Sequence, residues 1–146
     1  MVPLISGLDS GTRLHHARNI MVFEHFAINV PDVRSHARWY VDHLGFRVVR
    51  EKPDAPYTHF LGDDTGRVIV ELYSNPSAPV LPFAQLLPLC FHIAVIAADA
   101  RTERVRLEQA GATFFSEDNL PDGGRLIMLR DPWGVALQLC QRAQPL

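Results

Sequence analysis

The sequence predicts an α+β fold built from two tandem βαβββ modules. The first observation is an internal repeat, in which HFAINVPD at 25–32 aligns without a gap with HIAVIAAD at 92–99, an offset of 67 residues. The same offset aligns GRVIVELYS at 66–74 with WGVALQLCQ at 133–141. The second observation is the order of patterns in each half, where one strand precedes a helix and three short strands follow it. A duplicated module with a pseudo-twofold axis accounts for both observations.

The first half begins with a strand expected over 22–30, where large apolar side chains occur on both faces. Asp32 is a suitable N-cap for a helix over 33–44, whose apolar residues recur at helical spacing before a glycine ends it. His36 and His43 share a polar side of this helix, and we expect both to face solvent. The remaining strands of this half are expected at 46–51, 57–62 and 67–74, with the turn DDTG at 63–66.

The second half repeats this order more weakly. A strand is expected over 89–96, followed by a helix over 100–110 that Asp99 caps and a glycine ends. This helix has few apolar residues at helical spacing, so its prediction depends more on the alignment with the first half than on its own sequence. The remaining strands are expected at 112–116, 125–130 and 135–141, with the turn DPWG at 131–134.

The segment NPSAPVLPFAQLLP separates the halves, and its four prolines indicate a stiff, extended linker. One βαβββ sheet leaves a face uncovered, so we expect the two modules to curl into a mixed sheet around a central cleft. The expected parts are an N-terminal arm at 1–20, a first module at 21–75, the linker at 76–88, a second module at 89–142 and a tail at 143–146.

Composition limits the classes of function. The chain has 146 residues, 47% hydrophobic and 21% charged, with a formal net charge of −2 and no basic stripe, so we expect no nucleic-acid partner. No apolar run approaches the length of a membrane span, and the first twenty residues lack the apolar core of a signal peptide. Two cysteines, Cys90 and Cys140, indicate a reducing cytoplasm, and we expect both to be small buried side chains beside the site.

Polar residues recur at matched positions of the two halves. His25 and His92 are one repeat apart, as are Glu71 and Gln138, and each follows the histidine of its own half by 46 residues. An inward-facing carboxylate in VIVEL is costly unless it is protonated, paired with a charged histidine or bound to a cation. Two imidazoles, one carboxylate and one amide oxygen suit Ni²⁺, Zn²⁺, Co²⁺, Fe²⁺ or Mn²⁺ better than Ca²⁺. A metal site and a metal-free pocket both stay open.

The motifs HFAINVPD, YVDHLGFRVVREK, HIAV and DPWGVALQL resemble the vicinal oxygen chelate superfamily, which includes glyoxalase I, over residues 21–142. The resemblance implies that metal ligands come from the first and last strands of each module, at His25, Glu71, His92 and Gln138. Most relatives carry glutamate at the position of Gln138. The amide there counts against extradiol dioxygenases, although a mirrored triad of the other three residues keeps oxygenase chemistry open.

The resemblance and the repeat also imply pocket residues. Glutathione-dependent glyoxalases resemble this chain at Asn75, where an asparagine contacts the tripeptide. Asn29 stands where those enzymes carry an arginine, so glutathione as a co-substrate stays open. Four further candidates occupy matched positions before the two turns, where ordinary barrel packing explains them equally well: Thr58, Phe60, Leu126 and Met128.

These features predict a metal-dependent lyase or isomerase of the glyoxalase type that acts on a small α-oxygenated carbonyl or thioester. Glu71 is the expected catalytic residue, which shuttles a proton while the metal stabilises an enediolate. The alternatives are a metal-free protein that sequesters a small molecule and, less favoured, a dioxygenase. We expect a small-molecule partner and a homodimer, with the cleft formed either within one chain or across the dimer.

Overall fold

A computed structural model describes residues 21–146, and the expected arm at 1–20 lies outside the described residues. The two predicted modules are present, which confirms the α+β class. The first module contains β1 (Phe26–Asn29), α1 (Val33–Leu44), β2 (Arg47–Glu51), β3 (His59–Gly62) and β4 (Val68–Tyr73). The second contains β5 (Ile93–Ile96), α2 (Ala100–Gln109), β6 (Thr113–Asn119), β7 (Arg125–Arg130) and β8 (Ala136–Gln141). None of the helices in this range is long and apolar enough to cross a membrane.

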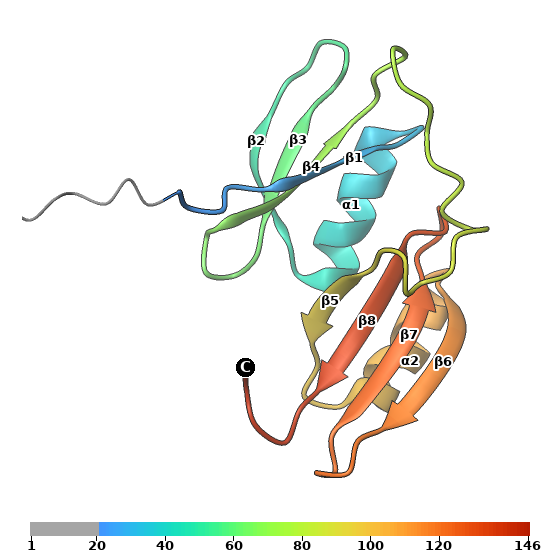
Figure 1. The fold of residues 1–146 in the computed structure, drawn as a ribbon. Coiled ribbons are helices and arrows are strands. Elements are labelled where there is room, and N and C mark those ends of the chain that lie inside the picture. Colours follow the sequence, from blue (N-terminus) through green and yellow to red (C-terminus); the bar gives the residue numbers. More distant parts are fainter. Residues whose placement is uncertain (1–20) are drawn as a thin grey trace, which may run out of the picture.

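The two modules have the same sheet topology. The strand orders are β1-β4-β3-β2 and β5-β8-β7-β6, and in each sheet the first and last strands of the module run parallel. The other neighbours are antiparallel. Figure 1 shows two separate sheets, with α1 beside the first sheet and reaching toward the second module. This shared order is the structural form of the sequence repeat.

Both helices begin at the predicted N-caps. The Asp32 carboxylate accepts hydrogen bonds from the Ser35 backbone N–H at 3.1 Å and from its hydroxyl at 2.6 Å. Asp99 caps α2 in the same way through Thr102. Gly45 ends α1 with a φ of 73°, a conformation that costs glycine little.

Replacing Asp32 by alanine is expected to lower the free energy of unfolding by about 1 kcal/mol, the usual cost of losing an N-cap. Hydrogen bonds from Ser35, above all from its side chain, hold the pKa of the Asp32 carboxyl below its usual value of 3.8. The stabilisation is therefore complete above pH 3.8 and is lost as the pH falls through the lowered value. Urea unfolding of the wild type and Asp32→Ala at pH 7 and in acid measures the difference in their free energies of unfolding. A difference that stays the same in acid contradicts this account.

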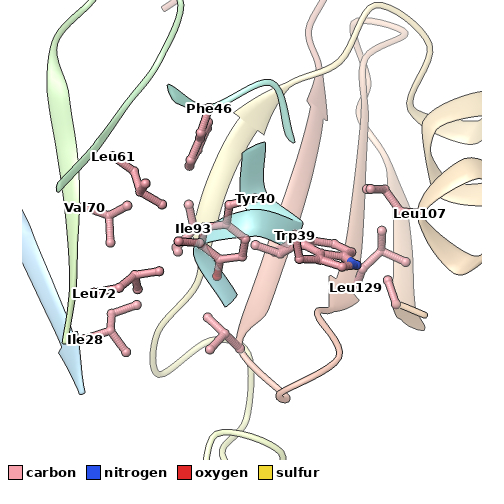
Figure 2. Close-up of a cluster of buried hydrophobic side chains, with 14 of the residues drawn as sticks. Ile28, Trp39, Tyr40, Phe46, Leu61, Val70, Leu72, Ile93, Leu107 and Leu129 are labelled. Atoms are coloured by element: carbon pink, nitrogen blue, oxygen red, sulfur yellow. The ribbon is translucent and has the colours of Figure 1, made fainter. Parts of the chain in front are cut away.

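The helix α1 buries two faces rather than one. One face packs on the first sheet, and the other contacts the second module, where the Trp39 Nε1–H donates to the Ala110 carbonyl at 2.8 Å. Arg106 also donates to the His43 carbonyl at 2.7 Å. Figure 2 shows Tyr40 and Trp39 between Leu61 and Leu72 of the first module on one side and Leu107 and Leu129 of the second module on the other. The modules therefore share one hydrophobic core, with α1 in the middle.

The prediction that His36 faces solvent is wrong. Its side chain is 0% exposed, and its Nε2 lies 2.6 Å from Asp131 Oδ2 in the DPWG turn of the other module. The Tyr40 hydroxyl donates to the same oxygen at 2.9 Å, and the imidazole stacks on Trp133. An ionised carboxylate only accepts hydrogen bonds, so His36 Nε2 carries the hydrogen. A polar side of α1 is thus buried because the second module covers it.

The linker is not extended as predicted. Leu86 N–H donates to the Pro82 carbonyl in a turn, and Phe83 between them is buried in the core. Arg130 on β7 donates to the carbonyls of Phe83 and Leu86 at 2.8 and 2.7 Å. Cys90 is exposed at the end of this segment rather than buried in a strand, which corrects the expectation for that cysteine. The linker therefore packs on the second sheet instead of only spanning the gap.

Candidate functional site

The two candidate histidines lie at equivalent places, one residue before an edge strand. The strand predicted over 22–30 begins only at Phe26, because pairing of β1 with β4 starts at Phe26 and Val70. Likewise β5 begins at Ile93, where it pairs with Leu137. Both histidines therefore lie just before a strand begins, where side chains need not alternate between the two faces of the sheet.

The first half-site consists of His25 and Glu71. His25 Nε2 lies 3.1 Å from Glu71 Oε2, and the two side chains are 25% and 21% exposed. Two donor atoms about 2.1 Å from one metal ion, at angles of about 90–110°, lie about 3.0–3.4 Å apart, so this spacing fits a shared cation as well as a hydrogen bond. Phe60 pairs with Glu71 across the sheet and meets the His25 ring edge-on, with centroids 5.6 Å apart.

The second half-site consists of His92 and Gln138. His92 Nδ1 lies 2.9 Å from the Pro88 carbonyl oxygen in the linker. Cys140 Sγ lies 3.4 Å from Gln138 Oε1. Burial raises the pKa of the Cys140 thiol, so the thiol stays protonated at neutral pH and donates its S–H to the amide oxygen. Two pocket candidates flank this half-site by strand register, with Met128 opposite Gln138 and Leu126 opposite Cys140.

The structure does not bring the two half-sites together. Across residues 21–146, no three His, Cys, Asp or Glu side chains come close enough to hold one metal ion. The two sheets are separate, and the shared core around α1 lies between them. The four-residue site expected from the sequence is therefore divided between two places in the chain.

Three other pocket candidates have polar groups that bond within the chain. The Asn29 side-chain amide donates to the carbonyls of Asn75 and Ala78, and the Asn75 N–H donates to Asn29 Oδ1. Thr58 is buried, and its carbonyl accepts from the Lys52 N–H. These bonds hold the start of the linker and the approach to β3. A ligand contact at these residues stays a prediction.

An apolar groove of about 350 Å³ lies beside the second half-site, between β5, the end of β8 and the C-terminal tail. Ala94 and Cys140 line it, and both belong to strands that flank or carry Gln138. Ile96, which is 89% exposed, and the C-terminal Leu146 complete its apolar lining. A small apolar molecule or a second protein chain fits such a surface.

Comparisons with known proteins agree with this architecture. The family model of the Glyoxalase/Bleomycin resistance protein/Dioxygenase superfamily matches residues 22–139. The chain belongs to this superfamily. A search among curated proteins finds no match. Membership in the superfamily confirms the resemblance inferred from the sequence motifs.

Solved structures with this superfamily's fold include proteins of different kinds. TnmS3, an antibiotic binding protein from Streptomyces sp. CB03234, is 22% identical over 86% of this chain and 98% of its own, with a TM-score of 0.65. A mutant of glyoxalase I from Zea mays is 22% identical over 83% of this chain and 45% of its own, with a TM-score of 0.62. A glyoxylase/bleomycin resistance protein/dioxygenase domain from Frankia sp. EAN1pec is 20% identical over 86% and 96%, with a TM-score of 0.61. At these identities the likeness shows the fold alone.

One contact of the first half-site was not expected from the sequence. Glu24 Oε1 lies 2.9 Å from His25 Nδ1, on the far side of the ring from Glu71. Neighbours in a strand point to opposite faces, so the pattern FEHF predicts no contact between these residues. The contact forms because His25 lies just before β1 begins.

Proposed function

We propose that this chain is a divalent-metal-dependent lyase or isomerase of the glyoxalase type, whose site combines the first half-site of one copy with the second half-site of another. The observation that carries this proposal is the convergence of His25 Nε2 and Glu71 Oε2 at 3.1 Å. Such a pair offers a metal only two ligands. The repeat supplies two more at the matched positions His92 and Gln138.

The combined donor set fits a transition metal. Two imidazole nitrogens, one carboxylate and one amide oxygen suit Ni²⁺, Zn²⁺, Co²⁺, Fe²⁺ or Mn²⁺, and a single anionic ligand leaves the site with a net charge near +1. When bound, such an ion polarises a substrate carbonyl and stabilises the charge of an enediolate. Glu71 removes the proton from the carbon beside the carbonyl and returns it to the neighbouring carbon. Phe60 covers one side of His25 and limits access of water.

The edges of the two sheets support an assembly of two copies. Strands β1 and β5 each lie at a sheet edge, where unpaired backbone groups offer a place for another strand. Phe23, just before β1, is 57% exposed, and Ile96 at the end of β5 is 89% exposed. A homodimer that joins β1 of one copy to β5 of the other covers both and brings unlike half-sites together. The free cysteines suit a cytoplasmic location.

A second candidate function is metal-free binding of a small apolar molecule. The apolar groove beside Gln138 favours it, and TnmS3, which shares the fold, is described as an antibiotic binding protein. In this case Glu71 pairs with His25 through their 3.1 Å contact instead of binding a metal. Absence of stoichiometric metal in the dialysed and reconstituted protein, together with retained ligand binding in His25→Ala, favours this function over the first.

Mixing two defective variants tests the proposed site. His25→Ala and His92→Ala are each expected to lose zinc binding at a concentration that saturates the wild type. When the variants exchange subunits, about half of the dimers are mixed, and each mixed dimer has one site with both histidines. We therefore expect roughly a quarter of the wild-type zinc to return, measured per chain after gel filtration.

The controls distinguish the possible outcomes. His59→Ala removes a histidine outside the half-sites and should leave zinc binding at the wild-type level, because His59 lies on the helix side of β3 and contacts Glu51. Mixed dimers that bind no zinc contradict a site shared between copies. Full zinc binding by both single variants contradicts the ligand assignment.

A further inference from the structure

We infer that Glu24 is a positioning residue, which keeps the hydrogen of a neutral His25 on Nδ1 and so leaves Nε2 free to bind the metal. This inference rests on the proposed function, since it concerns the same half-site. It starts from the position of the His25 ring between two carboxylates, Glu24 at 2.9 Å from Nδ1 and Glu71 at 3.1 Å from Nε2.

The two carboxylates compete for one hydrogen. A neutral imidazole carries a single N–H, and an ionised carboxylate only accepts hydrogen bonds. If the hydrogen lies on Nε2, it bonds to Glu71 and blocks the nitrogen that faces the half-site. If it lies on Nδ1, it bonds to Glu24, and the Nε2 lone pair and the Glu71 oxygen both point at the place for a cation. Glu24 therefore opposes the Glu71 contact that disables the half-site.

The second half-site provides the contrast. His92 Nδ1 faces the main-chain carbonyl of Pro88, which only accepts, so this nitrogen also carries the hydrogen. Its ligand partner is the amide of Gln138, and the repeat places Phe91 where the first half has Glu24. Without a carboxylate ligand beside it, His92 has less need of a charged partner. The histidine beside a carboxylate, His25, thus has a carboxylate as its outer partner, and the histidine matched with an amide, His92, has a main-chain carbonyl.

The exposure of Glu24 makes the inference testable without damage to the core. Its side chain is 82% exposed, so Glu24→Leu removes the carboxylate and little packing. Outer partners of metal-binding histidines typically contribute about 10–100-fold in affinity. Because Glu24 is exposed, we expect a loss of zinc affinity of about tenfold, at the lower end of this range, in Glu24→Leu. Glu24→Gln keeps an oxygen acceptor and should recover part of the loss.

A matched control is available at Glu51. Its carboxylate is 64% exposed and lies 3.2 Å from Nε2 of His59, a histidine outside both half-sites. Glu51→Leu therefore removes an exposed carboxylate from a histidine without touching the proposed metal ligands. We expect its zinc affinity to equal that of the wild type.

The experiment combines two measurements on the full chain. Nitrogen-15 NMR of the histidine rings in the metal-free protein above about pH 8, where imidazoles are normally neutral, reports which nitrogen carries the hydrogen. Competition with a chelator measures zinc affinity. We expect the Nδ1–H form of His25 in the wild type, a shift toward Nε2–H in Glu24→Leu, and no change at His92.

The two measurements separate this inference from the proposed function. If the wild type binds no stoichiometric zinc, the proposed function fails, and the His25 tautomer in Glu24→Leu still decides the role of Glu24. If the wild type binds zinc, and Glu24→Leu matches Glu51→Leu in both affinity and tautomer, the inference is overturned while the proposed function stands. An Nε2–H form of His25 in the metal-free wild type also overturns it.

Discussion

Replacing Asp131 by alanine is expected to lower the free energy of unfolding by about 3–5 kcal/mol, because each buried donor that loses its acceptor costs about 1–3 kcal/mol. The variant leaves His36 and the Tyr40 hydroxyl without their acceptor in the shared core. It also removes the acceptor for the N–H groups of Trp133 and Val135, which Asp131 Oδ1 holds at 2.9 Å in the DPWG turn. Urea unfolding at one fixed protein concentration measures the change.

The first module provides the control for this prediction. Asp63 begins the DDTG turn as Asp131 begins DPWG, and its Oδ1 accepts from the N–H and hydroxyl of Thr65. Asp63→Ala therefore removes a turn aspartate without a buried network, and we expect a much smaller loss of stability. Should Asp131→Ala fail to fold, Tyr40→Phe removes a single bond to the carboxylate and should cost about 1.5–3 kcal/mol. Equal losses in the two alanine variants contradict the role of the buried pair.

Replacing Glu71 by glutamine is expected to lower turnover by about 10²–10⁴-fold, the range that general acid–base groups contribute. An amide oxygen can still contact a cation, but an amide takes up no proton under these conditions. We expect the variant to retain zinc at a higher concentration while the metal-saturated kcat collapses. Candidate substrates are methylglyoxal adducts and acyl-CoA thioesters, and solvent deuterium incorporation at the carbon beside the carbonyl measures proton transfer directly.

The control for this prediction is Glu51→Gln, which changes an exposed carboxylate of the same sheet outside the half-site. It should leave both kcat and deuterium incorporation unchanged. Wild-type turnover in metal-saturated Glu71→Gln means that another group is the base. A parallel loss of bound zinc and activity, with normal kcat per bound zinc, means that Glu71 is a ligand only.

Most helices and strands could be predicted from the repeat, because helix caps and strand alternation depend on residues that are close together in the sequence. The N-caps at Asp32 and Asp99 and the alternation of the strands are local, and the structure places both helices within one residue of the predicted ends. The ends of β1 and β5 were less predictable, because a strand begins where its partner can pair with it. The apolar residues before Phe26 have the pattern of a strand in the sequence. In the structure they are not part of β1, because pairing with β4 begins only at Phe26.

The sequence predicted one close pair of the candidate site, and it did not predict where the second pair lies relative to the first. The repeat singled out His25 and Glu71, and the structure places His25 Nε2 and Glu71 Oε2 3.1 Å apart. Spacing in the sequence could not show that the second half-site lies elsewhere, because two modules can pair within a chain or between chains with the same local pattern. Glu24 was missed because its contact depends on where β1 begins.

The sequence by itself determined what each module is: the order of its strands and helix along the chain, and the matched polar residues just before its first strand and within its last, which recur at an offset of 67 residues. Only the tertiary structure decided how the modules meet. That outcome depends on which face of α1 the second module covers, and the contact of His36 with Asp131 joins residues 95 positions apart. Such a contact has no periodic signal, because a polar helix face has the same pattern whether water or a matching carboxylate covers it.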